Sequence, residues 1–123
     1  MAITELSRAP DIALVEKFIE VCLEQESKND GDHIQDYNKL IRRMVKITEE
    51  MKSRPGDARR LLTPLFGHSS WQVRVRAAMS AFALAPIEAR QVLEQVRATR
   101  VNPYAADASG MLAAIDAGEY TPK

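Results

Sequence analysis

The stretch that decides the fold runs from Leu61 to Ala78 and reads LLTPLFGHSSWQVRVRAA. Its leucines and phenylalanine recur at three- and four-residue steps, which is the spacing of one buried helix face. Polar residues from Gly67 to Ser70 interrupt this pattern, and a second helical pattern, rich in valine and alanine, follows at once. Short helices joined by a turn of a few residues pack as antiparallel neighbours. The stretch therefore predicts a pair of packed helices.

Capping residues place the ends of these helices. Asp57 precedes the first helix of the pair and is its expected cap. Ser69 with Gln72 three residues later forms a capping box for the second, which is expected over about 70–85. Asp11 is the expected cap of a helix nearer the start of the chain. Polar side chains at these positions satisfy backbone N–H groups that a helix leaves unpaired at its start.

The same pattern divides the rest of the chain. It predicts helices at about 11–27, at about 33–53, from Pro86 onward and at about 104–117. With the central pair this makes about six helices, and no segment alternates apolar and polar residues as a strand would. We therefore expect an all-α fold of antiparallel helix pairs. Residues expected to face the core are Ile12, Val15, Phe18, Ile19, Cys22, Ile34, Tyr37, Leu40, Ile41, Met44, Val45, Thr48, Met51, Leu62 and Leu93.

The central stretch also carries a family resemblance. A leucine-rich helix, a turn and then Val73-Arg74 followed by small residues resembles a HEAT-like repeat. The resemblance covers about residues 10–118. In the order and spacing of these residues, the chain is similar to a bacterial family of HEAT-like domains of unknown function. Further matching residues are Tyr37, Asn38, Lys39, Leu40, His68, Ala85, Pro86, Ala89, Ala108 and Leu112. The resemblance implies an α-solenoid with a right-handed superhelix and supplies no catalytic residues, and the Trp71-Gln72 pair departs from it.

Length and composition fit one globular domain. The chain has 123 residues, of which 46% are hydrophobic and 28% charged, which argues against disorder. We expect a single domain over 1–123, with an ordered core over 10–118 and short tails. The single cysteine, Cys22, excludes an intramolecular disulfide and favours a cytoplasmic location. Charges interrupt the apolar run from Ile12 to Leu23, so it predicts an amphipathic helix and not a membrane span.

Charge is unevenly distributed although the net charge is zero. Residues 39–100 hold thirteen basic and five acidic side chains, whereas residues 1–38 hold three basic and nine acidic ones. Such asymmetry is typical of a polyanion-binding face, or of an acidic helix lying beside a basic one. The sequence leaves both interpretations open. The basic residues concerned are Lys39, Arg42, Arg43, Lys46, Arg59, Arg60, Arg74 and Arg76.

Three residues near the central turn are candidates for binding or support. Trp71 opens a helix and could be an exposed binding anchor or a cover for the helix junction. Arg74 and Arg76 are two residues apart, so they cannot share one helix face. We interpret Arg74, which follows a valine as in HEAT-like units, as structural, and Arg76 as the more exposed. Asn38 is also a structural candidate, because a buried amide needs a hydrogen-bonding partner.

Motifs for catalysis or metal binding are weak. Asp30, Asp32, His33 and Asp36 are the one ligand-like group, and they match neither a calcium loop nor zinc spacing. No glycine-rich phosphate loop is present, and His68 has no neighbouring nucleophile in the sequence. A Ser-His-Asp arrangement assembled through space stays open. We expect no enzyme, no metal and no cofactor.

The leading hypothesis is a non-catalytic protein-binding module, either an adaptor or an immunity-type protein, with an unidentified protein partner. Trp71, Arg76 and the basic side chains of Arg42, Arg43, Lys46, Arg59 and Arg60 are its candidate binding residues. The alternative is nucleic-acid binding through the basic 39–100 segment, although the pI of about 6.7 is low for that function. The oligomeric state is open, and a dimer would cover an apolar end of an open helix stack.

Overall fold

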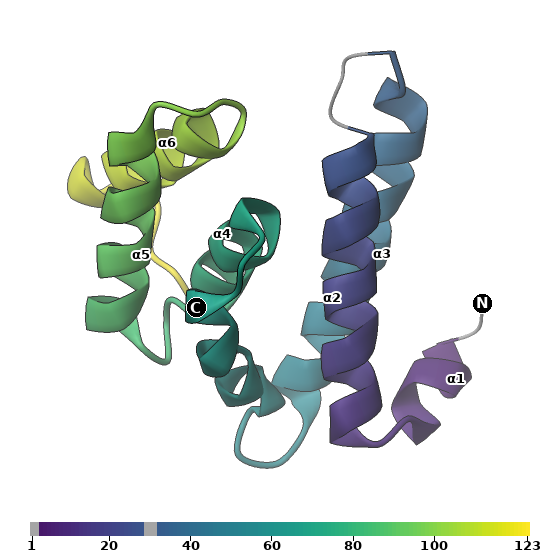
Figure 1. Cartoon of the computed structure of the whole chain (residues 1–123). Helices are drawn as coiled ribbons and strands as arrows, with labels where there is room; N and C mark the ends of the chain where they lie inside the picture. Colours follow the sequence, from purple (N-terminus) through teal and green to yellow (C-terminus); the bar gives the residue numbers. More distant parts are fainter. Residues whose placement is uncertain (1–2, 29–31) are drawn as a thin grey trace. The chain divides into compact units, whose positions relative to one another are not determined.

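The fold is all helical throughout the part of the chain that the computed structural model describes, residues 3–28 and 32–123 (Figure 1). The helices are α1 (Ile3–Arg8), α2 (Asp11–Ser27), α3 (Ile34–Ser53), the 3-10 helix η1 (Ala58–Gly67), α4 (Trp71–Ser80), α5 (Pro86–Thr99) and α6 (Tyr104–Asp116). The predicted all-α class is confirmed, with seven helices in the described residues instead of six. The additional helix, α1, has six residues, which is too short for a helical repeat to register in the sequence.

Residues group into two compact units, Met1–Leu61 and Leu62–Lys123. In the first unit α2 packs against α3, and α1 packs on α3. Two ion pairs show that α2 and α3 are antiparallel. Asp11 at the start of α2 contacts Arg54 after α3 at 2.9 Å, and Glu24 near the end of α2 contacts Arg43 at 3.8 Å.

The core of the first unit uses one stripe from each long helix. Successive members are three or four residues apart, as expected for two helices that pack along their length. The stripe of α2 consists of Leu14, Phe18, Val21 and Gln25, and that of α3 of Leu40, Met44, Ile47 and Met51. The predicted inward positions were wrong at Ile12, Ile34, Ile41 and Val45, which are exposed. Both helices carry a wider apolar arc than one partner helix covers.

The second unit is built around α5, which packs against α4 and α6. Its core consists of Val75, Ala78, Phe82, Ala89, Val92, Leu93, Val96, Ala108, Met111 and Leu112. Leu62 and Leu93 are fully buried, as predicted. Small alanines from α4, α5 and α6 allow the helices to approach closely, which explains how a core with few aromatic residues can be filled.

Local chemistry explains the helix type of η1 and the start of α4. Pro64 lies inside η1, and this proline lacks the N–H that an α-helix would need there. The cap of α4 is Ser70, whose Oγ accepts a hydrogen bond from the Val73 N–H at 3.3 Å. The predicted capping box on Ser69 was therefore displaced by one residue. The α4 helix also ends at Ser80, before the predicted limit near residue 85.

The remaining helix ends divide between confirmed and corrected predictions. Asp57 accepts a hydrogen bond from the Arg59 N–H at 3.1 Å, so its predicted capping role is confirmed. Asp11 is the first residue of α2, and its carboxylate contacts Arg54 instead of capping the helix. Pro86 begins α5, as predicted. No helix in the described ranges, 3–28 and 32–123, is long and apolar enough to cross a membrane.

Candidate functional site

Trp71 and Arg74 form a stacked pair at the start of α4. The Arg74 guanidinium lies 4.7 Å from the centroid of the Trp71 ring, a distance typical of a cation–π contact. Trp71 is half-buried and packs against the core of the second unit. Both contacts give the indole an intramolecular packing role.

Arg74 also fixes the turn before its own helix. Its Nε donates a hydrogen bond to the His68 carbonyl oxygen at 2.5 Å. The Ser70 N–H donates to Nδ1 of the same histidine at 3.0 Å, so His68 receives two hydrogen bonds within the turn. The histidine and the arginine therefore hold the η1–α4 junction. These contacts are what a structural arginine at position 74 would make.

Arg76 links two helices of the second unit. Its guanidinium lies 3.3 Å from the carboxylate of Asp107 on α6, and the arginine side chain is only 19% exposed. The sulfur of Met79 is a further neighbour at 3.8 Å. Arg76 is thus held between α4 and α6, which leaves little of its charged end available to an outside partner.

Arg59 forms a compact ion pair with the residue that caps η1. Its guanidinium lies 2.7 Å from Asp57, and the arginine side chain is 10% exposed. The side-chain hydrogen bond from Arg59 lowers the pKa of Asp57. Arg60, the next residue, is exposed. The predicted basic segment is thereby divided between internal ion pairs and surface charges.

The exposed basic surface lies on α3. Lys39, Arg42, Arg43 and Lys46 are all exposed on this one helix. Arg43 and Glu24 are each more than half exposed at 3.8 Å, so water screens their attraction. On α2, Glu16, Glu20 and Glu24 lie four residues apart and are exposed. Within this unit an acidic row on one helix therefore accompanies a basic row on its neighbour.

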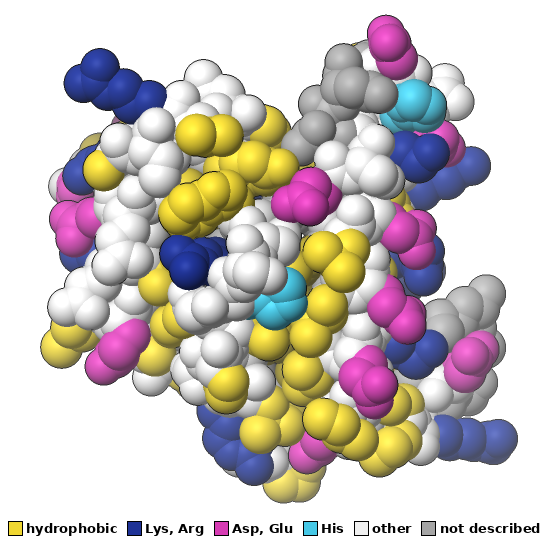
Figure 2. All heavy atoms as spheres, in the orientation of Figure 1, with side chains coloured by type: hydrophobic (Ala, Val, Ile, Leu, Met, Phe, Trp, Pro, Cys, Tyr) yellow, Lys and Arg dark blue, Asp and Glu magenta, His cyan; other side chains and the backbone are white. Residues whose placement is uncertain are grey.

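An exposed apolar surface was not foreseen from the sequence. Ile12 is 64% exposed on α2, and Ile34 is 62% exposed on α3. Leu23, Ile41 and Val45 are further exposed apolar residues of the same two helices. Figure 2 shows hydrophobic side chains in a row along α2, with acidic side chains in a second row beside them. The missed signal was the width of the apolar arc on each helix, because one partner helix covers only part of it.

Arg54 is a further residue that sequence reasoning missed. It donates hydrogen bonds to the Leu6 carbonyl oxygen, to Asp11 and to Glu50, at 2.9, 2.9 and 3.0 Å. The hydrogen bond that Arg54 donates to Asp11, followed by the one it donates to Glu50, raises the pKa of Arg54, so the guanidinium stays charged. One side chain thus joins α1, α2 and α3.

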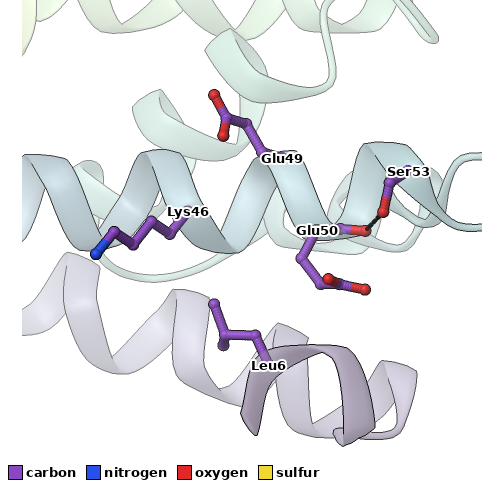
Figure 3. Close-up of a pocket in the computed structure, with 5 residues that line it drawn as sticks. All are labelled: Leu6, Lys46, Glu49, Glu50 and Ser53. Atoms are coloured by element: carbon purple, nitrogen blue, oxygen red, sulfur yellow. Dashed lines mark hydrogen bonds between the residues drawn. The ribbon is translucent and has the colours of Figure 1, made fainter. Parts of the chain in front are cut away.

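A shallow pocket of about 200 Å³ lies between α1 and α3 (Figure 3). It is lined by Leu6, Lys46, Glu49, Glu50 and Ser53. Glu50 is already engaged by Arg54, and the Ser53 hydroxyl donates to the Glu50 carbonyl oxygen at 2.7 Å. The Lys46 and Glu49 side chains project from separate turns of α3 in Figure 3.

The remaining candidates lie near the start of α3. Asn38 is exposed, so it is not the buried amide for which we predicted a structural role. Asp32 and Asp36 are exposed and His33 is half-buried, whereas Asp30 lies outside the described residues. Across residues 3–28 and 32–123, no three side chains of His, Cys, Asp or Glu are grouped as metal ligands would be.

The helices and contacts define a small, all-helical protein of packed adjacent helix pairs. The chain belongs to the family called domain of unknown function DUF2019, whose model matches residues 12–116. It is similar to the crystal structure of the protein RPA1889 from the bacterium Rhodopseudomonas palustris CGA009, with 36% sequence identity and a TM-score of 0.92. That match covers 96% of this chain and 98% of the other. None of the curated proteins matches the chain. Neither description indicates a function.

Proposed function

We propose that this chain is a non-catalytic protein-binding module whose contact surface is the exposed side of the α2–α3 hairpin. One observation supports this most directly. Ile34, Ile41 and Val45 on α3 are exposed although they are large and apolar, and they recur at helical spacing. Apolar residues grouped in this way are typical of a surface that another protein covers. Arg42 and Lys46 of the basic row border these apolar residues on the same helix.

The proposed surface differs from the one that the sequence favoured. Trp71 and Arg76 have partners within the second unit, so neither is a good anchor for an outside protein. An adaptor or immunity-type role remains the proposal, now through α2 and α3. The same proposal treats the packed pairs α2–α3 and α4–α5 as HEAT-like units, supported by their order and short links. It places the protein in the cytoplasm, which the lone, buried thiol of Cys22 favours.

The test is affinity capture of the tagged chain from its native lysate, with and without nuclease treatment. The variant Ile41→Asp puts a charge in the apolar surface, and Ile87→Asp, at a 70% exposed site on α5, is the matched control. We expect a protein partner that survives nuclease, is lost with Ile41→Asp and is kept with Ile87→Asp. Equal capture by both variants would move the binding surface away from α3.

Nucleic-acid binding is a second candidate, favoured by the five exposed cations on α3, which are Lys39, Arg42, Arg43, Lys46 and Lys52. The acidic row on α2 and the internal pairing of Arg59 and Arg76 reduce the positive surface that it could use. Binding to duplex DNA or RNA should weaken steeply with salt, since phosphate contacts release counterions. Capture that collapses with nuclease, together with a loss of binding in Lys46→Glu, would favour this function over protein binding.

A further inference from the structure

One buried side chain joins the short helix α1 to α3. Leu6 is 4% exposed, whereas its neighbours Glu5 and Ser7 are exposed. In Figure 3, Leu6 points towards α3, with Lys46 on one side of it and Glu50 on the other. An isolated helix of six residues is unstable in water, because its few hydrogen bonds do not offset the cost of starting it. The contact with α3 therefore keeps α1 helical.

Arg54 caps the C-terminal end of α1. Its Nη2 donates a hydrogen bond to the Leu6 carbonyl oxygen at 2.9 Å. That oxygen belongs to the last turn of α1, where a helix leaves carbonyl groups without α-helical partners. The guanidinium is also fixed without α1, because Nη1 donates to Asp11 and Nε donates to Glu50. The donor therefore stays in position whether or not α1 is seated.

The α1 site consists of Arg54 and of the α3 side chains around Leu6, which are Lys46, Glu50 and Ser53. The apolar row of the proposed function runs through Ile41 and Val45. Since an α-helix turns by about 100° per residue, Lys46 and Ser53 lie roughly a third of a turn away from that row. The shallow pocket of about 200 Å³ beside Leu6 shows that α1 fills its site incompletely. The α1 site is therefore a second surface of α3, with space for a larger side chain than leucine.

The contacts of α1 hold it on α3 only weakly. Burial of a leucine side chain favours the closed form on the order of 10- to 100-fold. About 1–10% of the chains then have α1 detached while α2 and α3 stay paired, which is local opening of a terminal element. A ligand of the uncovered site accordingly binds about 10- to 100-fold more weakly to a chain whose α1 can close.

We propose that α1 is a detachable cover, and that the site beneath it binds a short helical segment of another protein. The segment presents an apolar side chain, leucine or larger, from its last turn to the α1 site. A carbonyl oxygen of the same turn accepts the hydrogen bond from Arg54. The seated α1 shows this chemistry directly, because Leu6 supplies both groups. Recognition is of the helix-in-groove type, with α1 as the competitor within the same chain.

Fluorescence anisotropy with a labelled peptide of residues 1–10 tests the proposal on the full-length chain. The variant Leu6→Asp should detach α1, because a carboxylate is costly to bury without a partner. We expect the peptide to bind this variant with a Kd of about 10–100 μM, since closure is favoured roughly 10- to 100-fold at a millimolar effective concentration. The wild-type chain should bind the peptide at least about tenfold more weakly, because its own α1 competes.

Matched variants assign the binding to the α1 site. A peptide that carries Leu6→Asp should bind at least about tenfold more weakly. Adding Arg54→Ala to the Leu6→Asp chain should weaken binding about tenfold, whereas adding Lys52→Ala, at an exposed site, should not. Adding Ile41→Asp should also leave binding unchanged, so the outcome is independent of the surface proposed above. Circular dichroism checks that the helices remain, and Leu6→Ser takes the place of Leu6→Asp if that variant unfolds.

Three results would overturn the proposal. The first is a folded Leu6→Asp chain that binds no peptide up to about 1 mM. The second is equal binding by the wild-type and Leu6→Asp chains, which would mean that α1 covers nothing that the peptide needs. The third is binding that is lost with Ile41→Asp and kept with Arg54→Ala, which would place the peptide on the other surface of α3.

Discussion

At the residue scale, Arg54 is the side chain with the widest reach in the first unit. It joins the Leu6 carbonyl of α1, Asp11 of α2 and Glu50 of α3. We expect Arg54→Ala to lower the free energy of unfolding by about 1–3 kcal/mol, because charge-assisted hydrogen bonds are lost and Glu50 is left half-buried without its partner. Lys52→Ala, at an exposed site two residues away, is the control. Urea unfolding measures both, and equal effects would contradict a joining role.

The lowered pKa of Asp57 predicts how the stability of the fold depends on pH. Arg59 lowers its pKa below the usual value of 3.8, so the folded chain binds this proton less readily than the unfolded chain does. The stabilisation is therefore complete above pH 3.8 and is lost as the pH falls through that value towards the folded pKa. Asp57→Asn should cost about 1 kcal/mol at pH 7 and progressively less below pH 3.8.

Asparagine is the suitable replacement because residue 57 has φ +55°, a left-handed conformation that asparagine tolerates well. The amide oxygen can still accept the cap hydrogen bond, so the variant removes mainly the charge. Urea titrations at pH 7, 5 and 3 compare it with the wild type. A stability difference that stays constant over this range would mean that the ion pair with Arg59 does not set the effect.

Residue roles could be predicted from the sequence only where the partners are close along the chain. The valine–arginine pattern predicted a structural role for Arg74, whose contacts with His68 and Trp71 span six residues or fewer. Asp107 is 31 residues from Arg76, and Asp11 is 43 residues from Arg54. Nothing in the local pattern specifies which of seventeen acidic side chains each arginine meets. The packing of the helices decides it.

At the element scale, the start of α4 depends on one serine rather than its neighbour. Ser70 accepts the hydrogen bond from the Val73 N–H, whereas Ser69 is exposed and precedes the cap. We expect Ser70→Ala to cost about 1 kcal/mol and Ser69→Ala to be close to neutral. Thermal unfolding of the two variants provides the comparison. The opposite order would restore the capping box that the sequence suggested.

The sequence determined least well which side of each helix faces the core. On α2 and α3 the apolar residues cover so wide an arc that several stripes fit the same spacing. Tertiary packing selected the stripe with Leu14 and Phe18 on one helix and Met44 and Met51 on the other. On α5 of the second unit the buried residues, Ala89, Val92, Leu93 and Val96, follow the helical spacing of the sequence. The apolar residues of α2 and α3 that lie outside the buried stripes form the candidate binding surface.

Core burial gives the strongest element-scale prediction. Leu62 and Leu93 are fully buried, so each change to alanine should lower the free energy of unfolding by about 2–5 kcal/mol through lost apolar contact and the cavity left behind. Ile87→Ala, at an exposed site on α5, should change it by less than about 0.5 kcal/mol. Chemical unfolding compares the three variants. Near-neutral results at both leucines would contradict the packing described for them.

At the scale of the whole molecule, the basic side chains of the sequence fall into two groups, those that form internal ion pairs and those that stay exposed. Arg54, Arg59 and Arg76 hold elements together through carboxylates of the same unit. The exposed bases of α3 lie on the helix that packs beside α2, and α2 carries an exposed acidic row of Glu16, Glu20 and Glu24. A net charge of zero therefore arises from opposed surfaces of one hairpin as well as from internal pairs. This arrangement favours a partner with both signs of charge over a uniform polyanion.

The two compact units also allow a direct test of the single-domain prediction. The second unit has its own core, from Val75 to Leu112, so a fragment from Gly56 to Lys123 should fold alone. That length can supply at most about 3–5 kcal/mol of stability, so Leu93→Ala should unfold the fragment, whereas Ile87→Ala should not. Far-UV circular dichroism with urea unfolding measures both. A fragment without a cooperative transition would show that the chain folds as one domain, since its second half would then need residues 1–55 to be stable.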